Sequence, residues 1–354
     1  MKTYKIGVMG GDGIGPEVVA EAVKVLRGVQ EGFALDFVDY PFGGDHYLRT
    51  KEFIPDRAME EIRTLDAVLL GALGDPRFSP GFLERGIIFG LRLGLDLYVN
   101  YRPIKLYTEK LCPLKGKTPK DIDLVVCREN TEDIYTGTAR FENKGTVDEV
   151  AIQDARYTWK GTERIIRFAF ETARRRNLKK KVTLVDKANA IVAHDLLRRV
   201  FDHVAKDYPD IQKDTAYVDA TCMWLVKNPE AFDVVVTTNM FGDILTDLGA
   251  MIQGGMGIAA GGNIHPGKVS VFEPIHGSAP KYKGLKKVSP LAAILAPGLL
   301  LEHVGQKPAA DRIEAAVKKV LESDALPSID ASSGVPTDKV GDMVVAEMER
   351  KNKE

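Results

Sequence analysis

Two aspartates at helical spacing are the first residues of this sequence that suggest chemistry. Asp243 and Asp247 lie four positions apart, so a helix through them presents both carboxylates on one face. Two carboxylates that close repel each other unless a cation lies between them, and Mg²⁺ or Mn²⁺ prefers such oxygen ligands. Asp219 follows a strand-like run and is a candidate third ligand, although it can equally be a cap. The alternative for the pair is a solvated face that complements the helix dipole.

Three arginines, Arg92, Arg102 and Arg128, stand among apolar neighbours. A guanidinium offers two parallel donors to a carboxylate, so three of them suit a di- or tricarboxylate. The alternative is a set of structural ion pairs, since acidic residues lie nearby in the sequence. Lys187 and Tyr135 are candidate proton carriers if each is buried beside a charge, and ordinary surface residues if not.

A glycine-rich run from Gly11 to Glu17 follows a strand-like segment and opens a helical one. Its spacing is G-x-G-x-G, whereas the dinucleotide fingerprint is G-x-G-x-x-G, so a tight turn is the competing reading. The run from Gly255 to Ala260 has a loose fingerprint spacing but follows a helical segment. The standard Rossmann signature is therefore absent, and no histidine spacing typical of a zinc hydrolase occurs.

The elements that must position these residues alternate between strands and helices. Strand-like runs are expected at 4–9, 67–70, 124–127, 182–186 and 232–237, and helices at 16–28, 161–175 and 188–204. This order predicts an α/β protein with a largely parallel sheet. The polar, β-branched alternation from Thr138 to Trp159 predicts an antiparallel hairpin or arm.

Composition narrows the class of protein. The chain has 354 residues, 44% of them hydrophobic and 28% charged, which suffices for a large core, and its net charge of −1 argues against nucleic-acid binding. The longest apolar run, Leu291 to Leu301, is shorter than the roughly 20 residues of a membrane span. Three cysteines without C-x-x-C spacing and no visible export signal predict a cytoplasmic location, with no membrane partner.

The order of the motifs along nearly the whole chain resembles the β-decarboxylating dehydrogenases of 2-hydroxy acids, the isocitrate/isopropylmalate dehydrogenase family, and most closely its isopropylmalate branch. The motifs that carry this resemblance are Gly11 to Glu17, Arg92 with Arg102, Arg128 to Glu132 with Tyr135, Asp186 to Asn189, Asp219, Asn239 to Asp247, and Glu273 to Pro280. The resemblance implies two α/β domains with parallel and mixed sheets rather than a standard Rossmann fold. Residues 1–98 and 252–354 would bind the cofactor, and residues 99–251 would bind substrate and form the dimer, with the arm at 138–159.

The resemblance also implies roles for the candidate residues. Substrate would be held by Arg92, Arg102 and Arg128, and the divalent ion by Asp219, Asp243 and Asp247. That ion would polarise the 2-hydroxyl and stabilise the enolate left after hydride transfer and loss of CO₂. Lys187 would accept the hydroxyl proton and Tyr135 would protonate the enolate. Because the family shares its lysine and one metal aspartate between subunits, a homodimer is implied.

Substrate choice is expected to depend on the helix before Arg92, where Ile87, Ile88 and Phe89 form an apolar face that would contact the variable group of the substrate. This face predicts 3-isopropylmalate, the leucine-pathway substrate, with D-malate, tartrate, homoisocitrate and isocitrate as alternatives. Arg85 stands where isopropylmalate enzymes often carry a glutamate. A non-catalytic regulatory subunit is the alternative of another class, and such chains generally lose the lysine, the tyrosine or a metal aspartate.

The cofactor is expected to be NAD, with NADP as the alternative. The resemblance assigns the binding residues as Glu273, His276, Gly277, Ser278, Ala279, Pro280, Lys281, Tyr282, Ser289 and Asn189. NAD-linked members usually carry an acidic residue where Lys281 stands, and a lysine suits the 2′-phosphate of NADP. The downstream arginine of the NADP-linked enzymes has no counterpart in this sequence, however, and members of the isopropylmalate branch usually use NAD.

Overall fold

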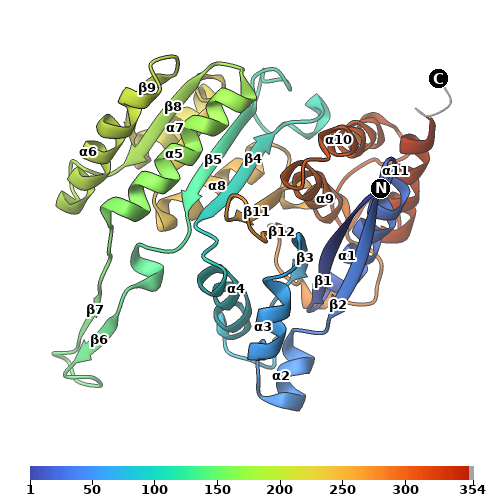
Figure 1. Cartoon of the computed structure of the whole chain (residues 1–354), viewed down its shortest axis with the longest axis horizontal. Helices are drawn as coiled ribbons and strands as arrows, with labels where there is room; N and C mark the ends of the chain where they lie inside the picture. Colours follow the sequence, from blue (N-terminus) through green and yellow to red (C-terminus); the bar gives the residue numbers. More distant parts are fainter. Residues whose placement is uncertain (351–354) are drawn as a thin grey trace. The chain divides into compact units, whose positions relative to one another are not determined.

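The computed structural model describes residues 1–350, which form two compact units (Figure 1). The first unit contains residues 1–97 and 106–119 together with the described residues from 253 onward. The second unit contains residues 98–105 and 120–252. The first unit is therefore assembled from both ends of the chain, and the second unit lies within the sequence of the first.

The first unit is built on strands that are mostly parallel. Their sheet order is β2 (Phe33–Tyr40), β1 (Lys2–Gly11), β3 (Ala67–Ala72), β12 (Val271–Pro274) and β11 (Ala260–Ile264). The β1–β2, β1–β3 and β3–β12 pairs are parallel, whereas β11 and β12 run antiparallel. All six residues of β3 are buried, which explains its continuous apolar sequence, because both faces of a central parallel strand are covered.

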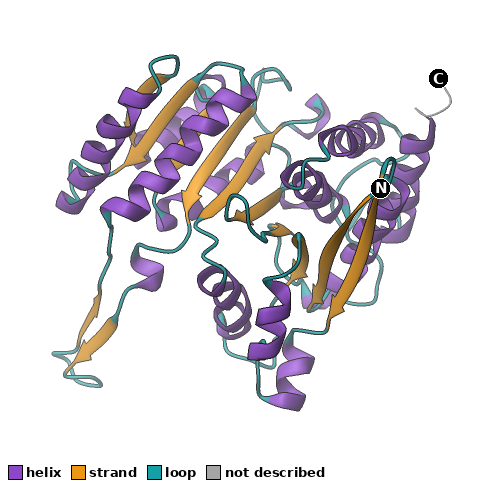
Figure 2. Cartoon of the chain, in the orientation of Figure 1, coloured by secondary structure: helices purple, strands orange, loops and turns teal. Residues whose placement is uncertain are grey.

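The helices of the first unit cover these strands (Figure 2). They are α1 (Gly15–Gly28), α2 (Gly44–Thr50), α3 (Asp56–Ile62), α4 (Phe82–Gly94), α9 (Leu291–His303), α10 (Lys307–Glu322) and α11 (Thr337–Arg350). Helix α9 is apolar on all sides because it packs against α1 and α10 as well as β11 and β12. Its composition therefore reflects a buried helix, and no helix among residues 1–350 is long and apolar enough to cross a membrane.

The second unit has its own helix-covered strands. Their order is β4 (Val99–Lys105), β5 (Asp123–Glu129), β10 (Val234–Thr237), β8 (Lys181–Asp186) and β9 (Gln212–Tyr217). Only the β4–β5 pair is antiparallel. Helices α5 (Trp159–Arg176) and α6 (Asp195–Val204) pack together, and so do α7 (Val218–Lys227) and α8 (Asn239–Ile252). The two helix pairs lie on opposite faces of the strands (Figure 1).

A two-stranded arm extends from the second unit. Strands β6 (Ala139–Glu142) and β7 (Val150–Gln153) pair antiparallel, and every residue of β6 is exposed. An isolated hairpin of this length is marginal in water, since it buries almost no apolar surface. The arm is therefore a segment whose apolar side chains, such as Phe141 and Val150, remain available for contact.

The structure differs from the sequence prediction at one helix. The helix expected over 188–204 begins only at Asp195, because Ile191 has an extended backbone (φ −105°, ψ 99°) that interrupts the helix, and a 3₁₀ turn, Val192–His194, follows it. In the preceding loop, Ala188 N donates to Asp186 Oδ1 (2.9 Å) and Lys187 N to His194 Nδ1 (3.0 Å). The sheets are largely parallel, as expected, and the antiparallel β4–β5 and β11–β12 pairs make them mixed.

Candidate active site

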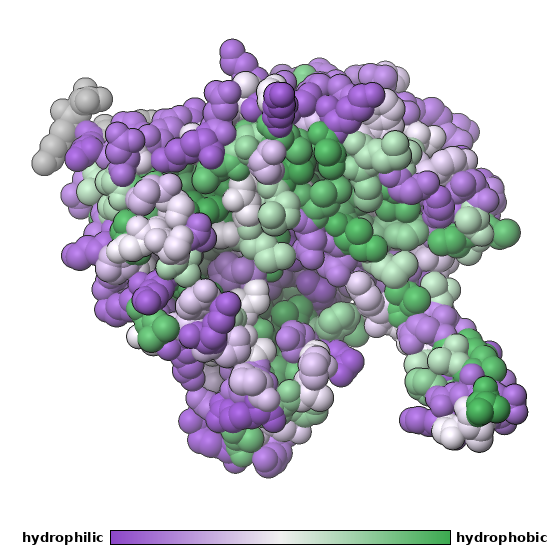
Figure 3. All heavy atoms as spheres, turned by 180° about the vertical axis from the view of Figure 1, so that it is seen from behind, coloured by the Kyte–Doolittle hydropathy of each residue, from purple (hydrophilic) through white to green (hydrophobic). Residues whose placement is uncertain are grey.

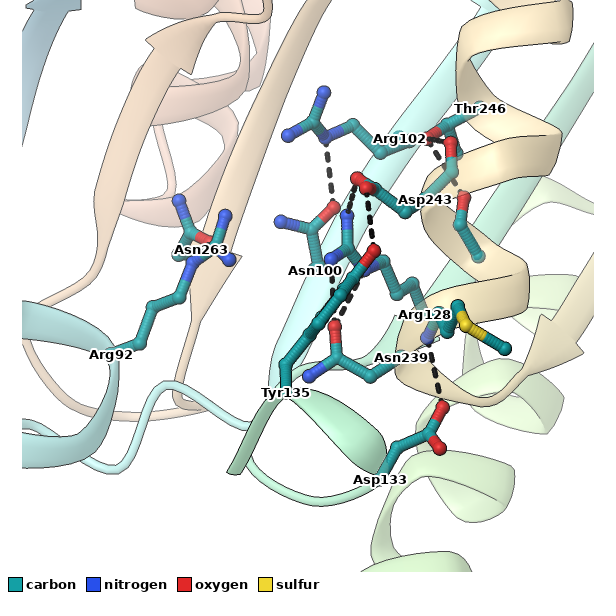
Figure 4. A network of polar contacts seen from close by, with 12 residues as sticks. Arg92, Asn100, Arg102, Arg128, Asp133, Tyr135, Asn239, Asp243, Thr246 and Asn263 are labelled. Carbon is teal, nitrogen blue, oxygen red and sulfur yellow. Dashed lines mark hydrogen bonds and ion pairs between the residues drawn. The ribbon is translucent and has the colours of Figure 1, made fainter. Parts of the chain in front are cut away.

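The carboxylates of helix α8 form the centre of the candidate site in the second unit. Asp243 forms an ion pair with Arg128, which comes from the end of β5, and accepts a hydrogen bond from the Tyr135 hydroxyl at 3.0 Å (Figure 4). Asp247 lies one turn further along the same helix. Strand β5, a 3₁₀ turn and helix α8 thus bring an arginine, a tyrosine and an aspartate into direct contact.

The charge balance at these two aspartates suits a cation. Burial raises the pKa of Asp247 above its usual value and the nearby Asp243 carboxylate raises it further, whereas the Arg102 and Arg128 guanidiniums lower it in part. A hard divalent ion relieves this repulsion, so the donor set fits Mg²⁺ or Mn²⁺. Among residues 1–350, however, no three His, Cys, Asp or Glu side chains lie together as a metal site. One chain therefore brings together Asp243 and Asp247, but not Asp219.

Arg128 is held by a buried asparagine that sequence reasoning did not single out. Only 2% of Arg128 is exposed, and Asn239 Oδ1 accepts bonds from its Nε (2.9 Å) and Nη2 (2.7 Å). Asn239 also donates to the carbonyl oxygen of Glu132 (3.1 Å). Arg102 is arranged in the same way, since its Nε donates to Asn100 Oδ1 at 2.8 Å. Neutral amides thus orient both guanidiniums, and Arg128 additionally forms its ion pair with Asp243.

Tyr135 lies on a 3₁₀ turn, Ile134–Thr136, which a short loop joins to the end of β5. Its side chain remains partly exposed, and the Arg128 guanidinium lies 5.7 Å from its ring centroid. Burial raises the pKa of Tyr135, and the Asp243 carboxylate adds to the effect because a phenolate beside it would be repelled. The phenol therefore stays protonated at neutral pH and is chemically able to donate a proton.

Lys187 and Asp219 form a second, separate pair in the same unit. Lys187 follows β8, and its Nζ lies 2.5 Å from Asp219 Oδ1. Asp219 belongs to the first turn of α7 rather than to the end of a strand, and the hydrogen bond from Lys187 lowers its pKa. The Lys187 backbone is fixed by His194, whose pKa is lowered by burial. A neutral imidazole accepting from a backbone N–H is consistent with that environment.

Arg92 is the candidate substrate residue of the first unit. It lies on α4, is 7% exposed, and donates from Nε to Asn263 Oδ1 at 2.9 Å (Figure 4). The same asparagine donates to Glu273 (2.8 Å), which joins Arg92 to the start of the expected cofactor loop. Phe89 lies beneath the Arg92 guanidinium, with 5.4 Å between the guanidinium carbon and the ring centroid.

The apolar face expected on α4 does not include Ile87. Ile87 is fully buried in the core of the first unit, together with Leu91 and Leu95, so it lines no open surface. Ile88 and Phe89 are half-buried, and Ile88 packs against the edge of this core. The spacing of Ile87, Leu91 and Leu95 at i, i+4 and i+8 is the helical core signal that distinguishes them.

The glycine-rich turn contacts the expected cofactor loop. Ile14 N donates to Ser278 O (2.9 Å), and a Cβ atom on Gly13, whose φ is +57°, would lie only 2.0 Å from that oxygen. The Asp12 carboxylate accepts from the backbone N–H groups of Gly44 (2.7 Å) and Gly74 (3.1 Å). The run is thus a tight turn before α1, and it also anchors the loop that starts at Glu273.

The other residues assigned to the cofactor differ in exposure. Glu273 and Ser278 are buried, whereas Lys281 is exposed, with its Nζ 4.8 Å from the Tyr282 ring centroid. The remaining first-unit residues of this set are His276, Gly277, Ala279, Pro280 and Ser289, all on the segment that follows β12. Asn189 belongs to the second unit and is exposed on the loop after Lys187.

Comparison with known proteins agrees with this arrangement. The family model described as isocitrate/isopropylmalate dehydrogenase matches residues 5–344. A protein of Thermobifida fusca named 3-isopropylmalate dehydrogenase is 47% identical, covering 92% of this chain and 93% of its own, and one of Corynebacterium diphtheriae with the same name is 45% identical, covering 98% and 100%.

Solved structures agree as well. Isocitrate dehydrogenase from Methylococcus capsulatus has a TM-score of 0.86 and 37% identity, covering 98% of this chain and 99% of that one. A β-decarboxylating dehydrogenase from Thermococcus kodakarensis in its apo form has a TM-score of 0.82 and 33% identity, covering 99% and 97%. The isopropylmalate dehydrogenase-like α/β fold is confirmed, and the chain belongs to the isocitrate/isopropylmalate dehydrogenase family.

Proposed function

We propose that this enzyme oxidises and decarboxylates 3-isopropylmalate to 2-oxoisocaproate, in the leucine pathway and in the cytoplasm. The observation that carries the proposal is the combination of carboxylate-binding groups and apolar surface: Arg92 lies directly over Phe89, next to Ile88 on the same helix. Relatives that are 45–47% identical over nearly their whole length bear the name of this activity. The three unpaired cysteines fit a reducing compartment.

The arginines bind the two carboxylates of the substrate. Arg128 and Arg102 are preoriented by Asn239 and Asn100, so little side-chain entropy is lost when a carboxylate binds. Arg92 would contribute from the first unit, and Phe89 and Ile88 would contact the isopropyl group. An apolar surface here favours a branched alkyl group over the third carboxylate of isocitrate or homoisocitrate, which would lie unpaired against it.

Asp243 and Asp247 would hold the divalent ion, with Asp219 supplied by a second copy of the chain. The bound ion would polarise the 2-hydroxyl of the substrate and stabilise negative charge on that oxygen. Lys187 would accept the hydroxyl proton, and Tyr135, which is protonated for the reasons given above, would return a proton to the carbon from which CO₂ departs.

A homodimer would complete this site. Helices α7 and α8 expose several large apolar side chains, and Figure 3 shows apolar side chains gathered on the face of the second unit that these helices cover. The exposed residues are Met223, Trp224, Val226, Ile244 and Met251. A second copy packed on this face would bury them and would bring its own Lys187–Asp219 pair toward Asp243. The second unit, with its arm, would then form the dimer, and the first unit would bind the cofactor.

The cofactor of this proposal is NAD. Glu273, at the end of β12, and the loop after it supply the binding residues, with the glycine turn at Gly13 fixing the loop. NADP is the alternative, because Lys281, Lys283 and Lys287 are exposed on the same segment and offer positive charge to a 2′-phosphate.

Purified protein should be assayed with 3-isopropylmalate, D-malate, isocitrate and tartrate, each with NAD and NADP, with Mn²⁺ present and then removed by a chelator. The proposal expects the highest kcat/KM for 3-isopropylmalate with NAD, and loss of turnover on chelation. Higher kcat/KM for D-malate or tartrate would refute the apolar pocket at Ile88 and Phe89. The absence of turnover with every substrate in folded, Mn²⁺-loaded protein would refute an enzymatic role and favour a regulatory subunit.

A further inference from the structure

Asp133 adopts a backbone conformation that side-chain-bearing residues rarely adopt. Its φ is +74° and its ψ is −164°, a region occupied almost only by glycine. The residue is 2% exposed and lies in the loop between β5 and the turn that carries Tyr135. A glycine would accept this conformation without strain, so the aspartate side chain must contribute something that offsets the strain.

The Asp133 carboxylate joins two segments that are distant in the sequence. Its Oδ1 accepts from Ile134 N (2.7 Å) and from the Tyr157 hydroxyl (2.7 Å). Its Oδ2 accepts from Met240 N (2.8 Å) in the first turn of α8. Figure 4 shows this last bond at the start of the helix that carries Asp243. One buried carboxylate therefore caps both the turn that carries Tyr135 and the helix that carries the aspartates.

The position of this cap determines how Tyr135 and Asp243 meet. Tyr135 lies two residues after Asp133, and Asp243 lies one helical turn after Met240. A carboxylate at a helix N-terminus satisfies an N–H group that has no partner within the helix and interacts favourably with the helix dipole. If either bond were lost, the bond from Asn239 to the Glu132 carbonyl would still join the two segments, but the 3.0 Å contact between the Tyr135 hydroxyl and Asp243 Oδ2 would be less firmly fixed.

We propose that Asp133 is a positioning residue that fixes the proton-donating Tyr135 relative to the metal-binding carboxylates of α8. Asp133 touches neither substrate nor metal in this role, and it acts through the two segments that it joins. The inference rests on the proposed function for the roles of Tyr135 and Asp243, whereas the carboxylate bridge itself is independent of those roles.

The direct test uses Asp133→Asn and Asp133→Gly. An amide has one acceptor oxygen, so Asp133→Asn loses the bonds on one side of the bridge, and Asp133→Gly relieves the backbone strain but loses all three side-chain bonds. Because outer-shell substitutions at metal sites typically cost 10–100-fold, we expect both variants to lower kcat and Mn²⁺ affinity by about tenfold or more. The KM for NAD should not change, since Glu273 and the loop after it belong to the other unit.

The controls separate positioning from general stability. Asp233 is a buried aspartate at the opposite end of β10, where it pairs with Arg176 (2.9 Å), so Asp233→Asn should lower the melting temperature without changing the Mn²⁺ affinity. Tyr157→Phe removes one of the three bonds and should give an intermediate loss of kcat. Wild-type kcat and Mn²⁺ affinity in folded Asp133→Gly would overturn the inference, because the three side-chain bonds of Asp133 would then be unnecessary for the geometry of the site.

Hydrogen exchange distinguishes failure of this inference from failure of the proposed function. In Asp133→Asn, amides of residues 134–137 and 239–243 should exchange faster than in wild-type protein, whatever reaction the enzyme catalyses. If Tyr135→Phe and Asp243→Asn leave turnover intact, the proposed roles fail while this exchange result still supports the bridge. If those two variants are inactive but Asp133→Asn keeps wild-type exchange and kcat, the bridge is refuted and the proposed function stands.

Discussion

Replacing Asn239 by alanine tests whether a neutral amide orients the substrate-binding arginine. The change removes the oxygen that accepts from Arg128 Nε and Nη2, and the donor to the Glu132 carbonyl. A hydrogen bond to a charged group contributes about 1.5–3 kcal/mol and a neutral one about 1 kcal/mol. Counting the shared acceptor once, we expect the free energy of unfolding to fall by about 2.5–4 kcal/mol.

The kinetic effect should be separate from this loss of stability. Arg128 keeps its ion pair with Asp243 but loses the contact that fixes its plane, and a misplacement of about 1 Å at a reacting site costs about 100-fold. We therefore expect kcat/KM for 3-isopropylmalate to fall by roughly that factor, mainly through KM, with the KM for NAD unchanged.

The assay is steady-state kinetics beside urea unfolding, with Asn228→Ala as the matched control. Asn228 is half-buried after α7, where its side chain donates to Glu230 (3.0 Å), so its loss should change stability slightly and kinetics not at all. An Asn239→Ala enzyme that is less stable but has wild-type kcat/KM would refute the orienting role.

Four further results are expected. Asp247→Asn should abolish the rise in melting temperature that Mn²⁺ causes at pH 7. Because the pKa of Asp247 is raised in the folded protein, its ionisation destabilises the metal-free protein above that pKa and has no such effect below the unfolded value of 3.8. The Mn²⁺ effect in wild-type protein should therefore shrink as the pH falls toward 4. Mixing inactive Lys187→Ala and Asp247→Asn proteins under subunit exchange should restore turnover if two chains share each site, and unchanged inactivity in demonstrated hybrids would exclude sharing. Ile88→Ser should reduce the preference for 3-isopropylmalate over D-malate by about 10–200-fold in kcat/KM, and an unaltered ratio would remove Ile88 from the pocket. Gly13→Ala should destabilise the first unit and raise the KM for NAD, because its Cβ would lie 2.0 Å from Ser278 O, and a wild-type KM in the folded variant would dissociate this turn from cofactor binding.

Much of the fold could be predicted from local patterns. The apolar runs of β3 and β8 mark strands that are buried on both faces, and the amphipathic spacing of α1 and α5 marks helices over a sheet. Strand direction was not predictable in the same way. The side-chain pattern of β4 is compatible with either a parallel or an antiparallel neighbour. Its antiparallel pairing with β5 depends on how the chain connects the two strands, which the side-chain pattern does not show.

The helix expected over 188–204 failed for a different physical reason. Its sequence has helical spacing, but Ile191 is extended, and the bond from Lys187 N to His194 Nδ1 closes the preceding residues into a loop. The spacing of apolar residues does not report a bond between a backbone N–H and a side chain seven residues away, so only the three-dimensional structure shows where the helix begins. This loop carries Lys187, so the deviation from local propensity occurs where the chain positions a reactive group.

In the candidate site, the sequence reveals the charged groups but not the neutral groups that hold them in place. Arg92, Arg102 and Arg128 are conspicuous because a cation among apolar neighbours needs an explanation. Their amide partners are not, since an asparagine near a strand end is ordinary, and Asn263 lies 171 residues from the arginine that it orients. Chemistry-bearing residue types can therefore be read from a sequence, whereas their orientation depends on contacts between distant segments. Variants of these amides, rather than further variants of the arginines, are accordingly the more informative tests of how this site works.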